Sequence, residues 1–340
     1  MEIKQIKNKE EWEKFVLSQP DTLFVQSFQY GEFYKKIGEN YWIFGLYENN
    51  NLIGGALVVS VHAKRGNFLF IPYGPILDFS NNLKLKEFSN FIKKFAKENN
   101  YDFVRISPFI EDNENNKKIF KSLGFKDAPI HILAETTWIL NLEPTEEELL
   151  SKMNKNHRNL ISRCQRENVF IDKSITEKAL NDFNNLHDIT AKRHNFHRFS
   201  KNYIDQEFLS FKNNNQALIF NGYLENKQLD SSAIIMLYGN TAVYRHGASL
   251  NLIKQIPTSY LLQWEAIKEA KKRGLKYYNF WGVAPENSST NHPFKGITHF
   301  KKGFGGYQKN LLHCQDLPIS WRYKINWLIE TLRSIKRGFK

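Results

Sequence analysis

Cysteine is scarce in this sequence. Only Cys164 and Cys314 occur among 340 residues, and they lie far apart in the chain. Two isolated cysteines exclude a disulfide framework and a zinc cluster, and they are typical of proteins from a reducing compartment.

Long apolar runs are missing as well. The opening residues, MEIKQIKNKEEWEKF, lack the apolar segment of a secretory signal. No run elsewhere approaches the roughly 20 apolar residues that a bilayer crossing needs. No low-complexity linker interrupts the chain. We therefore expect a cytoplasmic protein.

Acidic residues are outnumbered by basic ones. Lys and Arg total 48 against 35 Asp and Glu, which gives a net charge of +13 and an isoelectric point near 9.4. Such an excess favours polyanionic partners such as nucleic acid, phosphorylated metabolites or acidic membrane surfaces. A compositional bias toward Lys and Asn would produce the same numbers. Both interpretations stay open from composition alone.

The length favours two domains of roughly 150 residues each, and the chain repeats itself accordingly. Residues 41–61 and 216–238 each form two apolar runs around an Asn-containing turn, which indicates a β-hairpin. An amphipathic helix followed by a strand comes after each hairpin, at 84–107 and at 260–283. Equivalent positions are 176 to 177 residues apart. The order predicts duplicated α/β domains with mixed sheets and helices on their faces.

Two further segments carry basic residues. In EPTEEELLSKMNKNHRNLISRCQREN, Pro144 and Thr145 indicate a helix start, and cations follow in its second half, where a phosphate backbone or plain solvent could face them. The tail WRYKINWLIETLRSIKRGFK has an apolar stripe and a basic end. It could rest on an anionic membrane surface. We favour the alternative, in which the tail packs back on a domain.

The motifs of the second half and several of the first resemble one family. The resemblance is to the Fem-type peptidoglycan aminoacyltransferases (FemABX), in a compact form without the long helical arm. It spans almost the whole chain. The motifs that carry it are YGPILD (73–78), LGF (123–125), TTWILNL (136–142), YRHGAS (244–249), YLLQWEAIKEAKKRGLKYYNFWGV (260–283) and HPFKGITHFKKGFGG (292–306).

The resemblance implies two tandem GNAT-like acyltransferase domains, with residues 1–143 and 315–340 in the first, which binds the acceptor, and 144–314 in the second. It also implies transfer of an amino acid from aminoacyl-tRNA to the amine of a peptidoglycan precursor stem peptide, UDP-linked or lipid-linked. Aminoacyl-tRNA is then a co-substrate, and neither a cofactor nor a metal is expected. We expect a monomer, with peripheral contact to the inner face of the membrane as one option for the tail.

The same resemblance suggests the site residues. Lys301, just before the closing glycines, is the expected catalytic residue, because a lysine there would stabilise developing negative charge. Gly303, Gly305 and Gly306 would let the backbone approach closely. The expected substrate-binding residues are Lys35, Lys36, Arg105, Ser107, Arg193, Tyr244, Tyr260 and Trp281.

One departure from the family concerns the base. Relatives carry a carboxylate where this chain has Ser107, in the sequence RISP, and serine alone is no general base. The base is left unassigned, and proton transfer assisted by the substrate is an option.

Two rival functions remain at this stage. An acetyl-CoA-dependent N-acyltransferase would need a glycine-rich loop before a helix to grip a pyrophosphate, and neither YGPILDFSNN nor HGASLNLIKQIPTS has that spacing. A non-enzymatic RNA-binding protein would be marked by aromatic platforms among cations. We find no RNA-recognition signature.

Overall fold

The computed structural model describes residues 1–21, 23–63, 66–80, 82–194, 196–286, 288, 292 and 294–336. The chain forms two compact units. The first comprises Met1–Thr137, Gly282–Lys295 and Lys309–Lys340, and the second comprises Trp138–Trp281 and Gly296–Gln308. The boundaries differ from the expected 1–143 with 315–340 and 144–314, most clearly in the segment Gly282–Lys295, which belongs to the first unit.

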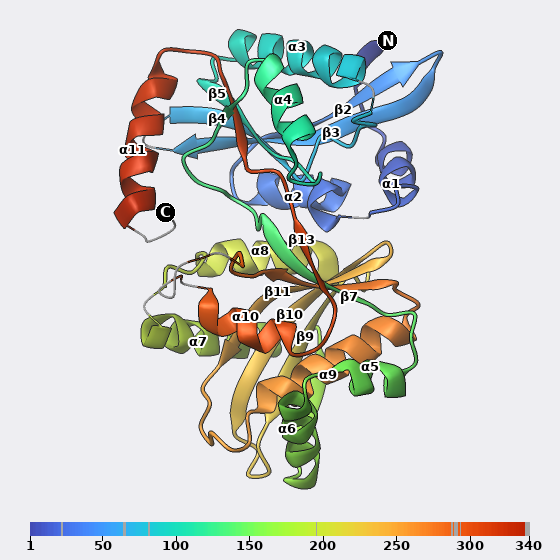
Figure 1. Ribbon diagram of the computed structural model, residues 1–340, viewed down its shortest axis with the longest axis vertical. Coiled ribbons are helices and arrows are strands. Elements are labelled where there is room, and N and C mark those ends of the chain that lie inside the picture. The colour runs from blue at the N-terminus through green and yellow to red at the C-terminus, as the bar shows by residue number, and fades with distance from the viewer. Residues whose placement is uncertain are drawn as a thin grey trace. The chain divides into compact units, whose positions relative to one another are not determined.

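The first unit is built on a seven-stranded mixed sheet with the strand order β1-β2-β3-β4-β5-β14-β6. Figure 1 shows α3 on one side of this sheet and α2 on the other. The elements of this unit are β1 (Glu2–Gln5), α1 (Lys9–Leu17), a 3-10 turn (Phe24–Gln26), α2 (Phe28–Lys36), β2 (Tyr41–Glu48), β3 (Asn51–Ala63), β4 (Gly66–Pro72), α3 (Asn82–Glu98), β5 (Phe103–Ser107), α4 (Glu114–Ser122), β6 (Lys126–Asp127), β14 (Gln315–Pro318) and α11 (Arg322–Lys336).

Local sequence explains the centre of this unit. Asn49 and Asn50 both adopt positive φ, at 49° and 64°, which is the backbone of the tight turn that matches the twist of β2 and β3. In α3, apolar residues at spacings of three and four line one face, from Leu85 through Phe88 and Ile92. That face packs on the sheet, and α3 leads into β5, which pairs in parallel with β4.

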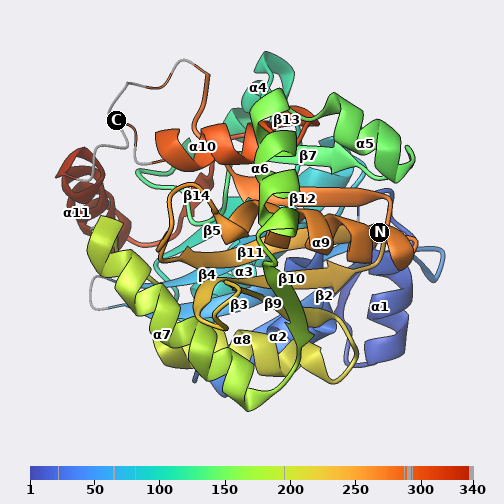
Figure 2. The same cartoon turned by 90° about the horizontal axis from the view of Figure 1, so that it is seen from below.

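The second unit repeats this plan, with the strand order β13-β7-β12-β11-β10-β9-β8. Figure 2 shows α9 on one face of its sheet and α7 and α8 on the other. Its elements are β7 (Thr136–Asn141), α5 (Glu146–Lys152), α6 (Lys155–Arg166), β8 (Phe170–Ser174), α7 (Glu177–His194), α8 (Lys201–Lys212), β9 (Ala217–Tyr223), β10 (Leu229–Tyr238), β11 (Thr241–Ser249), α9 (Thr258–Lys272), β12 (Tyr277–Gly282), α10 (Lys295–Lys302) and β13 (Tyr307–Asn310).

The two sheets have the same topology. In each, three antiparallel strands lead through a helix into a strand parallel to the third: β2-β3-β4-α3-β5 and then β9-β10-β11-α9-β12. The next place in each sheet is taken by a strand from elsewhere in the chain. β14, close to the C-terminus, lies beside β5, and β7, from the middle of the chain, lies beside β12. The predicted duplication and the mixed sheets are confirmed.

The segment expected to form one basic helix forms two. Thr145 and Glu148 make a reciprocal capping box at the start of α5. The helix then ends at Lys152, and the side chain of Asn154 accepts a hydrogen bond from the Asn156 backbone to start α6. Lys152 is therefore separated from the cations of α6.

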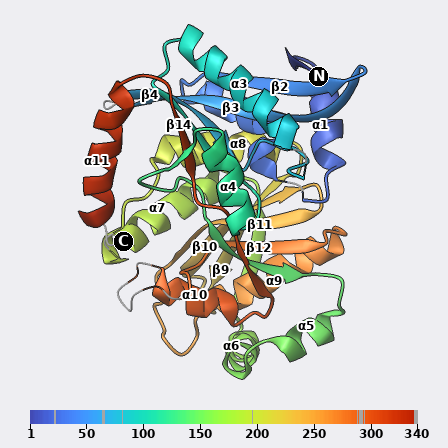
Figure 3. The ribbon, with the colours of Figure 1, turned by 45° about the horizontal axis from the view of Figure 1, so that its top comes forward.

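The C-terminal helix α11 packs on the first unit, as favoured, but with an unexpected face. Tyr323 contacts Phe103 edge to face, with 5.3 Å between ring centroids, and Glu330 is fully buried. The apolar stripe, including Leu328 and Leu332, is exposed. Figure 3 shows β14 leading into α11 at the edge of this unit. None of the helices in the described ranges combines the length and the apolar character that a bilayer crossing requires.

Arg105 explains why the polar face turns inward. Its guanidinium is fully buried and donates to Asp316 at 2.7 and 2.8 Å and to Glu330 at 2.7 and 3.3 Å. Asp316 lies directly opposite it on β14. Phe68 and Phe103 cover the guanidinium, at 5.4 and 5.2 Å from their centroids. Burial raises the pKa of Asp316, and the hydrogen bonds from Arg105 oppose that rise.

This ion cluster predicts a large effect of one substitution. Arg105→Met would leave two buried carboxylates without their cation, so we expect the free energy of unfolding to fall by about 3–5 kcal/mol in urea denaturation at pH 7. Lys94→Met is the matched control, because Lys94 makes only an exposed pair with Glu98 at 3.9 Å, and such pairs contribute less than about 1 kcal/mol. An equal small loss in both variants would contradict this account.

Candidate active site

Lys301 lies in α10, on a platform of packed rings. Phe304 belongs to the buried core of the second unit, and partly buried Phe300 packs against that core. Phe300 meets Tyr260 of α9 edge to face at 4.9 Å, and Phe304 stacks on Phe280 of β12 at 5.4 Å. These contacts fix the end of α10 and hence the position of Lys301. Tyr260, an expected substrate contact, thus packs beside the helix that carries Lys301.

The ammonium of Lys301 is removed from water. The residue is only 7% exposed, and its Nζ lies 5.7 Å from the ring centroid of Tyr244 on β11. Burial lowers the pKa of Lys301 from its ordinary value of 10.5 to about 7. Burial likewise raises the pKa of Tyr244, so its hydroxyl stays protonated at neutral pH. The structure therefore brings two predicted site residues together, Lys301 and Tyr244.

The glycines after Lys301 serve the fold itself. A methyl group on Gly303 would lie 1.9 Å from the His157 ring, and one on Gly306 would lie 2.3 Å from the Ile139 carbonyl oxygen. Gly305 and Gly306 also have φ values of +86° and +99°, which favour glycine. Close approach was predicted at these glycines. Gly303 and Gly306 approach the protein's own side chains and backbone.

His157 is a residue that the sequence analysis passed over. It is fully buried in α6, and its Nε2 lies 2.9 Å from the Phe300 carbonyl oxygen. Burial lowers its pKa, so the ring is neutral. It meets Tyr260 at 4.8 Å and Phe304 at 5.0 Å between centroids. His157 thus holds α10 against α6 and α9.

A second polar cluster was also missed, on the other face of the same sheet. Arg245 and His246 both hydrogen-bond to fully buried Glu207 of α8, at 2.9 and 2.8 Å. Burial raises the pKa of Glu207, but these two partners lower it to about 2. The Arg245 guanidinium lies 5.2 Å from the ring centroid of Trp281, an expected substrate contact. Trp281 has a φ of +65°, an uncommon value for a tryptophan.

Arg193 is placed where it can position a loop. It is in the last turn of α7, and its exposed guanidinium donates to the carbonyl oxygens of Ser249, at 2.7 Å, and Leu250. Ser249 is the last residue of β11, and Leu250 follows it. Part of its hydrogen-bonding capacity is therefore used within the second unit.

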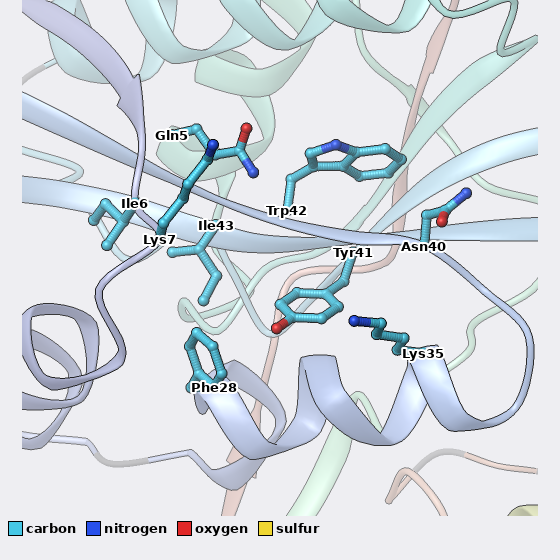
Figure 4. A pocket seen from close by; sticks show the side chains of 9 residues that line it. All are labelled: Gln5, Ile6, Lys7, Phe28, Lys35, Asn40, Tyr41, Trp42 and Ile43. Carbon is cyan, nitrogen blue, oxygen red and sulfur yellow. The ribbon is translucent and has the colours of Figure 1, made fainter.

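Lys35 and Lys36 lie at the C-terminal end of α2, where the helix dipole favours cations. Both are exposed. Lys35 borders a hollow of about 360 Å³ between α2 and β2. Figure 4 shows the Lys35 side chain extending from α2 toward Tyr41. The Tyr41 hydroxyl donates to Glu32. The hollow is lined by Gln5, Ile6, Lys7, Phe28, Lys35, Asn40, Tyr41, Trp42 and Ile43.

Arg105 and Ser107 differ from the expectation that they bind substrate. Arg105 is fully buried and held by two carboxylates, so it presents no surface to a ligand. Ser107 is 3% exposed, and its Oγ lies 3.5 Å from the Cys314 sulfur. Both side chains belong to the interior of the first unit, because β5 is a central strand covered on both faces.

The low pKa of Lys301 predicts a pH-dependent stability difference. The unfolded chain binds a proton at Lys301 up to pH 10.5 and the folded chain only up to about pH 7, so stability rises with pH between these values. Lys301→Met removes this dependence. We expect its stability relative to the native chain to fall by about 2–3 kcal/mol from pH 7 to pH 9 in urea denaturation. Lys302→Met is the matched control, and an unchanged difference for Lys301→Met would contradict burial of the ammonium.

The packing of Gly303 predicts the effect of a single methyl group. Gly303→Ala would clash with the His157 ring and is expected to cost about 1–3 kcal/mol of stability. Gly296→Ala, in the same helix region, meets nothing within 4 Å and should stabilise by about 0.5–1 kcal/mol, because alanine favours a helix. Thermal unfolding of both variants measures the contrast. Equal melting temperatures of the two variants would show that the backbone around Gly303 moves to accommodate the methyl group without loss of stability.

Known proteins resemble this chain in both sequence and fold. A lipid II:glycine glycyltransferase of Staphylococcus epidermidis is 21% identical over 366 residues, covering 86% of this chain and 87% of that protein. The crystal structure of FemX matches with a TM-score of 0.84 and 19% identity, covering 97% of this chain and 100% of that one. A tandem GNAT protein from the clavulanic acid biosynthesis pathway matches with a TM-score of 0.53 and 9% identity, over 83% and 84% of the two chains. The predicted tandem GNAT-like fold is thereby confirmed. A profile of the FemAB family matches residues 8–231 and 224–330, and the chain therefore belongs to the FemAB family.

Proposed function

We propose that this protein, an aminoacyltransferase of the FemAB family, transfers an amino acid from aminoacyl-tRNA to the amine of a peptidoglycan precursor stem peptide. The acceptor nitrogen attacks the ester carbonyl of the charged tRNA. The bond between that carbonyl and the ribose oxygen breaks, the ribose oxygen takes up a proton, and an amide forms. The ester is already activated, so the protein's part is to hold the reactants and stabilise the charge that develops.

The observation that carries this proposal is the buried ammonium of Lys301. A cation in a site with little water interacts strongly with an oxyanion, because the dielectric screening is low. Burial makes the charged form costly in the resting protein, as its pKa near 7 expresses. A negative charge developing nearby would offset that cost. Lys301 is therefore proposed to gain stabilisation in the transition state rather than in the ground state.

The donor is proposed to be recognised in part by α6. Lys155, Arg163 and Arg166 are exposed on this helix, which has no acidic residue of its own. Phosphate contacts by Lys and Arg supply sequence-independent affinity for nucleic acid. This cationic helix belongs to the same unit as Lys301, and its residue His157 is packed beneath the end of α10.

The acceptor is proposed to carry a diphosphate, in either a UDP-linked or a lipid-linked precursor. Lys35 and Lys36 offer two exposed cations at a helix end, and phosphates are held by such cations through charge-assisted hydrogen bonds. The name of the staphylococcal relative specifies lipid II as its acceptor. This favours the lipid-linked form here as well.

Single-turnover chemistry tests the proposal. Charged tRNA is mixed with a UDP-linked or lipid-linked muramyl pentapeptide, and the longer peptide is followed by mass spectrometry. We expect Lys301→Met to lower the transfer rate at saturating substrate by about 10²–10³-fold, as when an oxyanion partner is lost, with tRNA binding retained. Lys302→Met, the neighbouring change, should leave the rate within a few-fold of the native protein.

The outcomes separate the rival functions. Acyl transfer from acetyl-CoA with no reaction from charged tRNA would replace the proposal by an N-acyltransferase. Tight tRNA binding without product from either acceptor would favour a non-enzymatic RNA-binding protein. A native rate in Lys301→Met would remove Lys301 from the chemistry.

A further inference from the structure

The C-terminal helix α11 carries its polar residues inward and its apolar residues outward. Its buried positions are Tyr323, Asn326, Glu330 and Ser334. Large apolar side chains occupy the exposed side, which is the reverse of an ordinary surface helix. The row of exposed apolar residues here called the α11 stripe consists of Ile325 (47% exposed), Leu328 (56%), Leu332 (61%) and Ile335 (60%), together with Trp321 (69%) immediately before the helix.

The stripe is continuous along the helix. Ile325, Leu328 and Leu332 follow one another at spacings of three and four residues, which places them on one side of an α-helix, and Ile335 extends the row. At 3.6 residues per turn this side is opposite to Glu330. A soluble protein rarely exposes a contiguous row of this kind unless something covers it.

Cations border the stripe on both sides. By the same helical geometry, Lys324 lies along one margin and Arg322 and Arg333 along the other, with Lys336 at the end. All four are exposed. Glu330 is the only acidic residue in the sequence of α11, and it is buried against Arg105. The outer surface of this helix is therefore apolar in the middle and positive at its edges.

The ion cluster fixes this orientation. Glu330 accepts two hydrogen bonds from Arg105, and Tyr323 packs on Phe103. Rolling α11 to bury the stripe would expose Glu330 and leave Arg105 short of a carboxylate. The apolar side is thus held outward by the most buried charges of the first unit.

We propose that the α11 stripe docks on an anionic lipid bilayer. An interfacial helix presents leucine, isoleucine and tryptophan to the boundary of the acyl chains, while lysine and arginine at its margins reach the phosphate headgroups. Trp321 and Trp327, the latter 40% exposed, suit the interface, where tryptophan is enriched in membrane proteins. A second copy of this chain is a poorer occupant. Two such helices face to face would bring cationic margins together with no acidic residue between them.

This inference goes beyond the proposed function, and it can fail separately. Its measurement uses vesicles without tRNA or peptidoglycan precursor. Docking on a bilayer would place the protein on the same membrane that contains a lipid-linked acceptor.

Vesicle flotation of the full chain tests the inference. Vesicles of phosphatidylcholine with phosphatidylglycerol are compared with vesicles of phosphatidylcholine alone at low and high salt. We expect binding to the anionic vesicles that weakens with salt, and little binding to the neutral ones. Arg333→Gln/Lys336→Gln should lower the partition coefficient about 30-fold, which is about five-fold for each cation. The control is Lys93→Gln/Lys97→Gln, two exposed lysines of α3, which should bind as the native chain does.

The apolar part has its own matched pair. Leu328→Glu/Leu332→Glu should abolish flotation with the melting temperature retained, since both side chains are exposed. Phe170→Glu/Ile189→Glu adds the same charge at equally exposed apolar positions outside α11, 62% and 51%, and should still float. Equal binding to neutral and anionic vesicles would overturn the proposal. The proposal would also be overturned if the native chain did not bind the vesicles and instead formed a dimer in analytical ultracentrifugation, and if Leu328→Glu/Leu332→Glu dissociated that dimer.

Discussion

The pairing of Arg105 with Asp316 and Glu330 is the interaction on which the first unit depends. A guanidinium in the centre of β5 has no access to water, so it requires carboxylates inside the protein. Those carboxylates come from residues 211 and 225 positions later in the chain. Asp316 belongs to the strand β14, and Glu330 belongs to the helix α11. The cluster therefore determines both where the last segment returns and which side of α11 faces outward.

Duplication with exchanged strands organises the rest. Each half supplies the three antiparallel strands, the crossover helix and the parallel strand of its own sheet, and the next position is filled by a distant segment. In the second unit that arrangement places β7 beside β12. The turn after α10, at residues 303–306, lies against β7 at Ile139. Gly303 and Gly306 leave no room for a side chain, because the His157 ring and the backbone at Ile139 occupy the space around them. Lys301 is buried as a result of the same packing.

Much of this could be predicted from the sequence. The hairpins follow from alternating apolar residues around Asn turns, and α3 follows from Leu85, Phe88 and Ile92 at helical spacing. Lys301 was found through its motif, and its burial with Tyr244 supports that choice without testing its role. Periodicity shows which side of α11 is apolar, but it cannot show whether that side is covered. Arg245 and His246 were passed over because the motif drew attention to Tyr244. Simple alternation would place these two neighbours on opposite faces, but the pairing of β11 with β10 shifts register between Tyr244 and His246, and both side chains reach Glu207.

The position of β14 has a consequence for how the protein is made. A ribosome releases the chain from its N-terminus, and domains usually fold in that order. Here the first sheet lacks its sixth strand until residues 315–318 have emerged. Until then β5 is an edge strand of the sheet, and Arg105 lacks the carboxylates of Asp316 and Glu330. The first unit is therefore completed only after the whole second unit has been synthesised, and nascent chains would need protection at that open edge.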